Sequence, residues 1–242
     1  MSEKVIIPGP DAASDRQESQ EPSSPDDQPD RLGWEMLFEF QAMVTELRQT
    51  EGIVDVYFRR YEPVPDFTIE TIEHGLGTRV PDRIKSFYRV TDGLEFGWSY
   101  TVDGETLPGG GAHLFDFATV FDNWLDSLWS VDPEEFSESE LDFFWSLRGF
   151  DRLGDAEAGH MIVLCVEEEY PTYDLFVHDL HTRDSKLLEL TFGEYIDRLL
   201  ESRGAYGWQH LLTEEPATDS TITDHVFEMA ERFFPEADLG GD

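Results

Sequence analysis

The apolar positions of this chain form their clearest pattern between residues 67 and 98. The first part of that stretch has the period of a helix with one buried face. Its apolar positions are Ile69, Ile72 and Leu76. Asp66 stands just before them and predicts an N-cap, because its carboxylate can accept a hydrogen bond from the first turn. Gly75 and Gly77 predict the end of this helix, since glycine adopts the left-handed backbone found at many helix ends.

A second helix and a strand are predicted in the same stretch. Pro81 marks the start of the helix, since its fixed φ and missing N–H are tolerated in a first turn. The apolar stripe of this helix consists of Val80, Ile84, Phe87 and Tyr88. Asp92-Gly93 predicts its end. From Leu94 to Val102 apolar residues alternate with polar ones, which is typical of a strand with one buried face.

Similar patterns predict the elements on either side. Helices are expected over residues 34–49, 123–129, 191–203 and 224–234, with another that begins at Pro133. Strands are expected over residues 113–121, 161–166, 173–180 and 186–190, and residues 53–61 alternate ambiguously. Asp103-Gly104 predicts a turn, Pro108-Gly-Gly-Gly a flexible loop, and Thr191 with Glu194 a capping box. The fold class expected is α+β, with a largely antiparallel sheet flanked by helices and extra helices at both ends.

Residues 69–93 resemble the N-terminal signature of the SUKH superfamily, whose members include bacterial toxin-immunity proteins and a yeast cell-wall regulator. That signature reads I-x-x-x-E-x-x-L-G-x-x-L-P, followed by a short helix that ends in a polar residue and glycine. The matching residues are Ile69, Glu73, Leu76, Gly77, Pro81, Phe87, Asp92 and Gly93. Val80 stands where the family more often has Leu, and Asp92 where it more often has Asn.

The resemblance extends over about residues 66–203. Gly154 and Gly159 match two glycines of the family's middle part, while His160 stands where the family usually has Asp. A helical insertion at about 123–148 interrupts the match, and residues 204–242 form an extension beyond it. The resemblance therefore implies one SUKH-like domain over residues 31–242. Residues 1–30 are rich in Pro, Ser, Gln and Asp, and this composition predicts a disordered acidic tail.

Charge narrows the classes of partner. The chain carries 53 Asp and Glu residues against 17 Lys and Arg residues, for a net charge of −36. Such a surface repels nucleic acid and anionic membranes. It suits a basic protein partner, a high-salt cell interior or plain solubility. No apolar run is long enough to cross a bilayer and the N-terminus has no secretory signal, so a soluble, cytoplasmic protein is expected.

Few residues carry patterns typical of catalysis or metal binding. His178 and His181, with Asp179 between them, could hold a metal, although a zinc site needs further ligands. The single cysteine, Cys165, lies in an apolar run and is expected to be a buried hydrophobic residue. No phosphate loop, H-E-x-x-H, C-x-x-C or G-x-S-x-G string occurs. We therefore expect a protein that is not an enzyme and holds no cofactor or metal.

The expected partner-binding residues are acids on the rim of the predicted sheet. They are Glu95, Asp103 and Glu105 near the first strand and Glu167, Glu168 and Glu169 in a later turn. Trp98 or Tyr100 either supplies an apolar anchor to the partner or packs in the core. The aromatic residues Trp34, Phe38 and Phe40 have the same two interpretations.

The SUKH resemblance implies a function. It is that of an immunity protein, which neutralises a cognate bacterial toxin by occluding the toxin's active site. A basic active-site groove, such as that of a nuclease, would complement the acidic surface of this chain. The alternative is a SUKH-like regulator or scaffold without a toxin partner.

Overall fold

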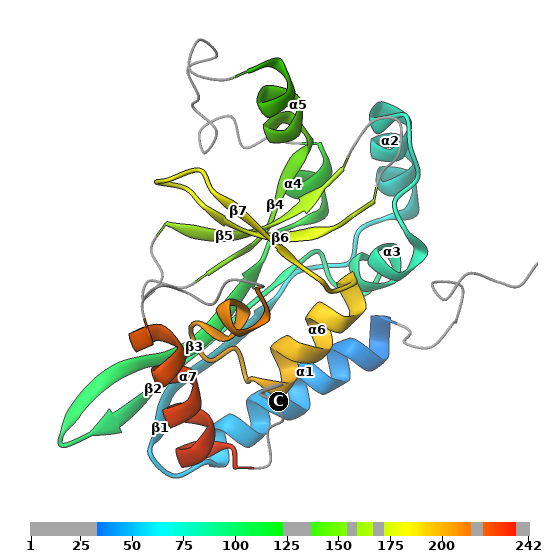
Figure 1. Ribbon diagram of the computed structural model, residues 1–242. Helices are drawn as coiled ribbons and strands as arrows, with labels where there is room; N and C mark the ends of the chain where they lie inside the picture. Colours follow the sequence, from blue (N-terminus) through cyan, green and yellow to red (C-terminus); the bar gives the residue numbers. More distant parts are fainter. Residues whose placement is uncertain (1–32, 123–136, 154–158, 167–171, 214–219, 236–242) are drawn as a thin grey trace, which may run out of the picture. The chain divides into compact units, whose positions relative to one another are not determined.

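In the part of the chain that the structure describes, seven strands form one antiparallel sheet in which each strand pairs with its neighbours in the sequence (Figure 1). They are β1 (Ile53–Arg60), β2 (Leu94–Val102), β3 (Glu105–Leu114), β4 (Leu147–Arg152), β5 (His160–Cys165), β6 (Leu175–Asp179) and β7 (Ser185–Leu188). The computed structural model describes residues 33–122, 137–153, 159–166, 172–213 and 220–235. The chain divides into two units, residues 1–30 and 31–242, and the predicted tail lies outside the described residues. The antiparallel sheet expected from the sequence is confirmed.

Helices pack against this sheet and complete an α+β fold. They are α1 (Gly33–Gln49), α2 (Asp66–Leu76), α3 (Asp82–Tyr88), α4 (Phe117–Phe121), α5 (Glu138–Ser146), α6 (Phe192–Glu201), the 3-10 helix η4 (Trp208–Leu212) and α7 (Ser220–Phe233). Helix α1 contacts β1, α3 and α6, and α3 also contacts α6. A large buried cluster of apolar side chains joins these helices to the sheet. Its burial is the main contribution to the stability of the fold.

The predicted order of two helices and a strand between residues 66 and 102 is confirmed by α2, α3 and β2. The prediction of Asp66 as an N-cap is wrong by one residue. Pro65 is the N-cap of α2 and makes no side-chain cap bond. Asp66 is the first helical residue, and its Oδ1 accepts a hydrogen bond of 2.8 Å from Arg89 Nε on the adjoining turn. Gly77, with φ 70°, ends α2 as predicted, whereas Gly75 lies within it.

Helix α3 ends before the predicted Asp92-Gly93 stop, and these two residues form a tight connection into β2. Gly93 has φ 81°, and a Cβ atom there would lie 2.5 Å from the carbonyl oxygen of Leu114. The carboxylate of Asp92 accepts a hydrogen bond of 2.7 Å from the N–H of Phe117, the first residue of α4. Burial raises the pKa of Asp92, and this hydrogen bond partly offsets the effect. The dipeptide therefore joins β2 to α4 rather than capping α3.

The prediction of a flexible loop at Pro108-Gly-Gly-Gly is wrong, because these residues lie within β3. The glycines are required by close packing instead. A Cβ atom at Gly109 would lie 2.1 Å from the ring of Trp98, and one at Gly110 would lie 2.4 Å from the carbonyl oxygen of Gly204. The N–H of Gly111 also donates to the carbonyl of Gly204, at 2.8 Å. Glycine in a strand often marks such close approach of another backbone.

The predicted strand over residues 113–121 is only partly correct. Strand β3 ends at Leu114, and the remaining residues form the short helix α4. Asp116 starts this helix as its N-cap, and its side chain accepts a hydrogen bond from the N–H of Thr119. The capping signal of Asp116 was therefore the informative feature, and the apolar run beside it was misleading.

The other predicted elements are confirmed to within a few residues, which is the usual uncertainty of helix and strand ends. The predicted helix over 34–49 lies in α1, and the one over 224–234 lies in α7 except for its last residue. Of the ambiguous residues 53–61, all but the last form β1. The capping box of Thr191 and Glu194 starts α6, with both reciprocal hydrogen bonds present. Cys165 is buried as predicted, and its Sγ lies 3.2 Å from the hydroxyl of Ser146. The predicted helix over 123–129, the helix start at Pro133 and Gly154 lie outside the described residues.

Candidate protein-binding surface

The predicted rim acids of β2 and β3 do not form one surface. Asp103 and Glu105 are exposed at the tip of the β2–β3 hairpin, beside a turn in which Asp103 and Gly104 have φ 51° and 84°. Glu95 lies near the other end of β2, about 26 Å away at the usual rise of a strand. The three acids therefore cannot meet the same small part of a partner.

Glu95 lies in a polar setting on the sheet rather than in an acidic one. Its Oε1 lies 3.4 Å from the hydroxyl of Tyr57, and its Oε2 lies 3.7 Å from Arg59 Nη1. Glu95 also lines a hollow of about 220 Å³ together with Tyr57, His113 and Arg152. The hollow has mixed charge, which makes it a poor complement to a strongly basic partner.

Trp98 and Tyr100 are core residues in this structure, with 3% and 6% of their surfaces exposed. The indole N–H of Trp98 donates a hydrogen bond of 2.8 Å to the carbonyl of Arg203. The ring of Trp98 lies edge-on to Phe234 at 5.6 Å, and the ring of Tyr100 lies edge-on to Phe233 at 5.8 Å. Both rings are covered by the end of the C-terminal helix, so neither is placed to anchor a partner on the rim.

The three consecutive acids Glu167, Glu168 and Glu169 lie outside the described residues. Their assignment to the partner-binding surface stays a prediction.

The candidate metal ligands His178 and His181 are placed differently. His178 is buried, and its Nδ1 lies 2.8 Å from the hydroxyl of Ser185 on β7. Burial lowers the pKa of His178 to about 4, an effect that the carboxylates of Asp179 and Asp184 oppose. His181 is exposed in the turn that follows β6. Within the described ranges, no group of three or more His, Cys, Asp or Glu residues is arranged to hold a metal ion.

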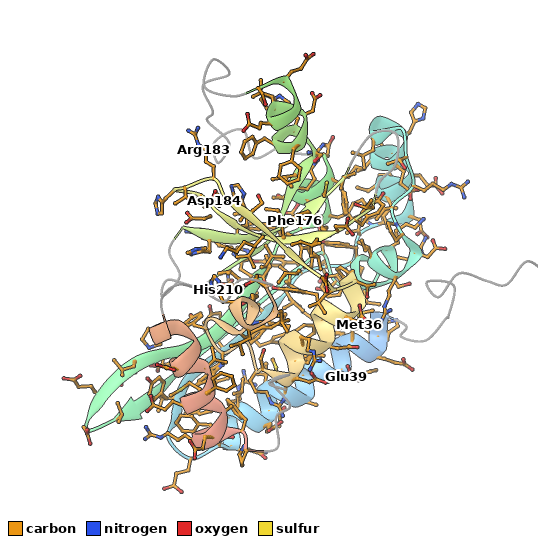
Figure 2. The ribbon with its side chains drawn as sticks, in the orientation of Figure 1. Met36, Glu39, Phe176, Arg183, Asp184 and His210 are labelled. Atoms are coloured by element: carbon orange, nitrogen blue, oxygen red, sulfur yellow. The ribbon has the colours of Figure 1, made fainter. Side chains whose placement is uncertain are left out.

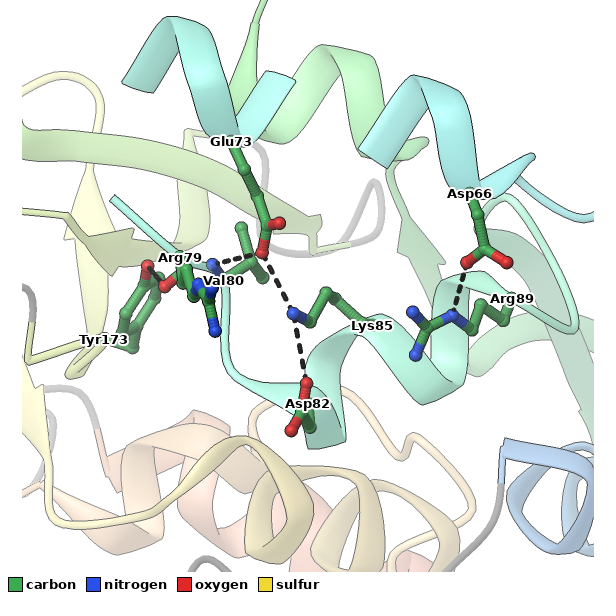
Figure 3. Close-up of polar contacts among 8 residues, drawn as sticks. All are labelled: Asp66, Glu73, Arg79, Val80, Asp82, Lys85, Arg89 and Tyr173. Carbon is green, nitrogen blue, oxygen red and sulfur yellow. Dashed lines mark hydrogen bonds and ion pairs between the residues drawn. The ribbon is translucent and has the colours of Figure 1, made fainter. Parts of the chain in front are cut away.

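The polar residues of the signature hold α2 and α3 together (Figure 3). The carboxylate of Glu73 accepts hydrogen bonds from the N–H of Val80 at 2.9 Å and from Lys85 Nζ at 3.0 Å. Lys85 Nζ is also 3.0 Å from the carboxylate of Asp82. From the far side of the turn, the hydroxyl of Tyr173 donates to the carbonyl of Arg79 at 2.7 Å. These contacts give the polar residues of the motif over residues 69–93 a structural role. The motif therefore does not by itself indicate where a partner binds.

A groove of about 440 Å³ lies between α1 and α6. Its lining consists of Glu39, Ala42, Met43 and Glu46 from α1, and Asp197, Leu200, Glu201 and Arg203 from α6 and the residues after it. Figure 2 shows Glu39 on α1, beside α6. Met43 and Leu200 are buried and contribute apolar surface to the groove, whereas Ala42 is exposed. The groove therefore combines an apolar base with polar walls.

The walls of this groove are predominantly acidic. Four lining residues are acidic, namely Glu39, Glu46, Asp197 and Glu201, and Arg203 is basic. Arg203 Nη2 is 3.0 Å from both carboxylate oxygens of Glu46, and Arg198 Nη1 is 3.0 Å from Glu201. These contacts hold Glu46 and Glu201 in place. The excess of acidic over basic residues leaves a surface that favours a cationic ligand.

An exposed aromatic pair lies on α1, one turn before the groove. Trp34 and Phe38 have 51% and 62% of their surfaces exposed, and their ring centroids are 6.3 Å apart. Phe40, on the opposite side of the helix, is fully buried. Core packing therefore applies to Phe40. Trp34 and Phe38 are exposed, as a partner anchor requires. Aromatic residues of this kind often carry much of the binding energy at protein interfaces.

Comparison with known proteins adds no assignment, since no protein-family model and no curated protein matches this sequence. Each helix in the described part of the chain is too short or too polar to cross a membrane.

Proposed function

We propose that this chain is a non-catalytic protein-binding domain that neutralises a basic protein. The observation that carries the proposal is the face formed by α1 and α6, where an exposed aromatic pair adjoins an acid-lined groove. Apolar anchors beside charges of one sign are typical of a surface that binds a partner of the opposite charge. The net charge of −36 accelerates the approach of such a partner over a longer range.

The resemblance of residues 66–203 to the SUKH superfamily supports a more specific form of this proposal. The chain is then an immunity protein that acts in the cytoplasm and covers the active site of a cognate bacterial toxin. A nuclease fits this form best, because its active-site groove must be basic to bind a phosphate backbone. Occlusion needs no reacting group on the immunity protein, and it needs no cofactor or metal. The alternative form is a SUKH-like regulator or scaffold that binds a basic partner without neutralising a toxin.

The test is coexpression with the proteins encoded by the genes next to this one. We expect one neighbouring protein to arrest growth when expressed alone, and growth to recover when this chain is also expressed. The same pair should coelute as a stable complex in size-exclusion chromatography. Binding without growth arrest would favour the regulator or scaffold form. If no neighbouring protein binds the chain, the immunity proposal is wrong.

A further inference from the structure

We infer that the partner inserts an amphipathic helix, bearing lysine or arginine, into the groove between α1 and α6. This inference rests on the proposed protein-binding function and specifies how the partner is held.

The spacing of the lining residues indicates a helical occupant. On α1 they are Glu39, Ala42, Met43 and Glu46, which are separated by three, one and three positions. On α6 they are Asp197, Leu200 and Glu201, separated by three and one. Residues three and four apart share one face of a helix, so each helix presents one continuous row of side chains to the groove. Two such rows, side by side, form the surface on which a third helix packs.

The chemistry of the two rows specifies the faces of that third helix. Its apolar face meets Met43 and Leu200, and the small side chain of Ala42 lets its backbone approach α1 closely. Its flanks meet the carboxylates of Glu39 and Glu201, which favour lysine or arginine at those positions. The Glu46–Arg203 ion pair marks one end of the groove, and Glu39 lies toward the other end, about two turns earlier on α1.

The aromatic pair extends the apolar row at that other end. Trp34, Phe38 and Ala42 are four residues apart, so they lie along one side of α1. The distance from Trp34 to Glu46 along the helix axis is about 18 Å, which matches about 12 residues of a partner helix. A single short helix can therefore contact the aromatic pair and the groove together.

The negative charge of the chain favours a cationic partner protein over a second copy of the chain or nucleic acid in this groove. A second copy of this chain also carries a charge of −36 and is repelled. Nucleic acid is repelled for the same reason. A cationic helix gains attraction along the whole groove, and salt weakens this attraction because exposed charges are screened.

A designed peptide tests the inference without knowledge of the natural partner. The probe is an 18-residue fluorescent helix with leucines along one face and lysines on both flanks, and a matched peptide replaces every lysine with glutamate. Fluorescence anisotropy at pH 7.5 measures binding to the full chain. We expect the lysine peptide to bind, its affinity to fall by roughly tenfold between low and high salt, and the glutamate peptide not to bind.

Substitutions in the groove test whether the peptide binds there. We expect Glu39→Lys combined with Glu201→Lys to weaken binding of the lysine peptide by at least about tenfold. The control, Glu62→Lys with Glu70→Lys, changes the net charge equally at exposed positions just before α2 and on it, and should bind nearly as the parent does. Ala42→Trp fills the groove without changing charge and should also weaken binding by about tenfold. Circular dichroism checks that each variant melts near the parent temperature.

The inference is wrong if the parent does not bind the lysine peptide, or if both groove variants bind it as the parent does. It is also wrong if the groove variants alter only self-association of the chain, since the occupant is then a second copy.

The experiments distinguish failure of this inference from failure of the proposed function. If a neighbouring protein binds the parent and both groove variants equally, the helix-in-groove inference fails and the protein-binding function stands. If the peptide binds the groove but no neighbouring protein binds the chain, the immunity proposal fails and the groove assignment stands.

Discussion

Acidic side chains have different roles in the α2–α3 region and in the α1–α6 groove. In the first region Asp66 contacts Arg89 at 2.8 Å, and Glu73 and Asp82 both contact Lys85 at 3.0 Å. Two basic residues thus accompany three acids. In the groove four acids line the walls, where Glu46 pairs with Arg203 and Glu201 pairs with Arg198.

The difference separates charges that hold the fold from charges that face a partner. Where acids are matched by cations and N–H groups, as around Glu73, removing one should destabilise the protein. Where acids gather in excess along an apolar groove, mutual repulsion makes them a modest cost to folding. Their removal should therefore affect binding far more than stability. The Glu73 and Asp82 variants test the first half of this contrast, and footprinting of Glu39 and Glu201 tests the second.

The largest effect is expected at the connection that places the α2–α3 region against the sheet. Gly93→Val should destabilise the protein by about 3 kcal/mol, because valine is strained at φ 81° and its Cβ would meet the backbone of Leu114. Gly104→Val is the matched control. Gly104 has φ 84° but open space around it, so the loss there should be about 1–2 kcal/mol, from strain alone. Urea denaturation measures both, and equal losses would show that packing at Gly93 is unimportant.

The next largest effect is a loss of folding stability at low pH, caused by His178. Burial lowers the pKa of His178 from 6.5 to about 4, so the folded protein resists a proton that the unfolded chain accepts. Stability is therefore complete above about pH 6.5 and is lost as the pH falls toward 4, by up to about 3 kcal/mol. His178→Asn lacks the titrating group and should lose less stability over that interval. Identical pH dependence in the parent and the variant would contradict this role of His178.

The smallest expected effects compare Glu73 and Asp82, the two acids that contact Lys85. The side chain of Glu73 is 16% exposed and that of Asp82 is 90% exposed. Glu73→Gln should cost about 1–3 kcal/mol, because it leaves the largely buried Lys85 without its buried partner. Asp82→Asn should cost less than about 0.5 kcal/mol, since exposed ion pairs contribute little. If the two variants have equal midpoints in urea, the carboxylate of Glu73 does not hold α2 to α3 as described.

Much of the fold could be predicted because local signals agree with tertiary packing. The helical stripe of α2, the alternation of β2 and the capping box of α6 all lie where the sequence pattern places them. The failures occur where distant segments override local preference. The glycines of β3 predict a loop by their local preference. They are instead strand residues that accommodate the ring of Trp98 and the backbone of Gly204.

The candidate site could be predicted only in part, for a related reason. Alternation along β2 shows that Trp98 and Tyr100 share a face, but it cannot reveal that Phe233 and Phe234 cover that face. The aromatic residues of α1 were recognised as either core or partner-binding, and only the packing assigns Phe38 to the surface. The groove itself joins α1 to a helix about 150 residues later, and no local pattern predicts that pairing.

Carboxylate footprinting of the complex tests most directly whether the α1–α6 face binds the partner. The chain is labelled with a carbodiimide and an amine, alone and in complex with the neighbouring protein that it binds, and modified peptides are quantified by mass spectrometry. We predict that labelling of Glu39 and Glu201 falls severalfold in the complex, while labelling of Asp103 and Glu105 at the hairpin tip is unchanged. Protection at the hairpin tip with full labelling of Glu39 and Glu201 would contradict the account.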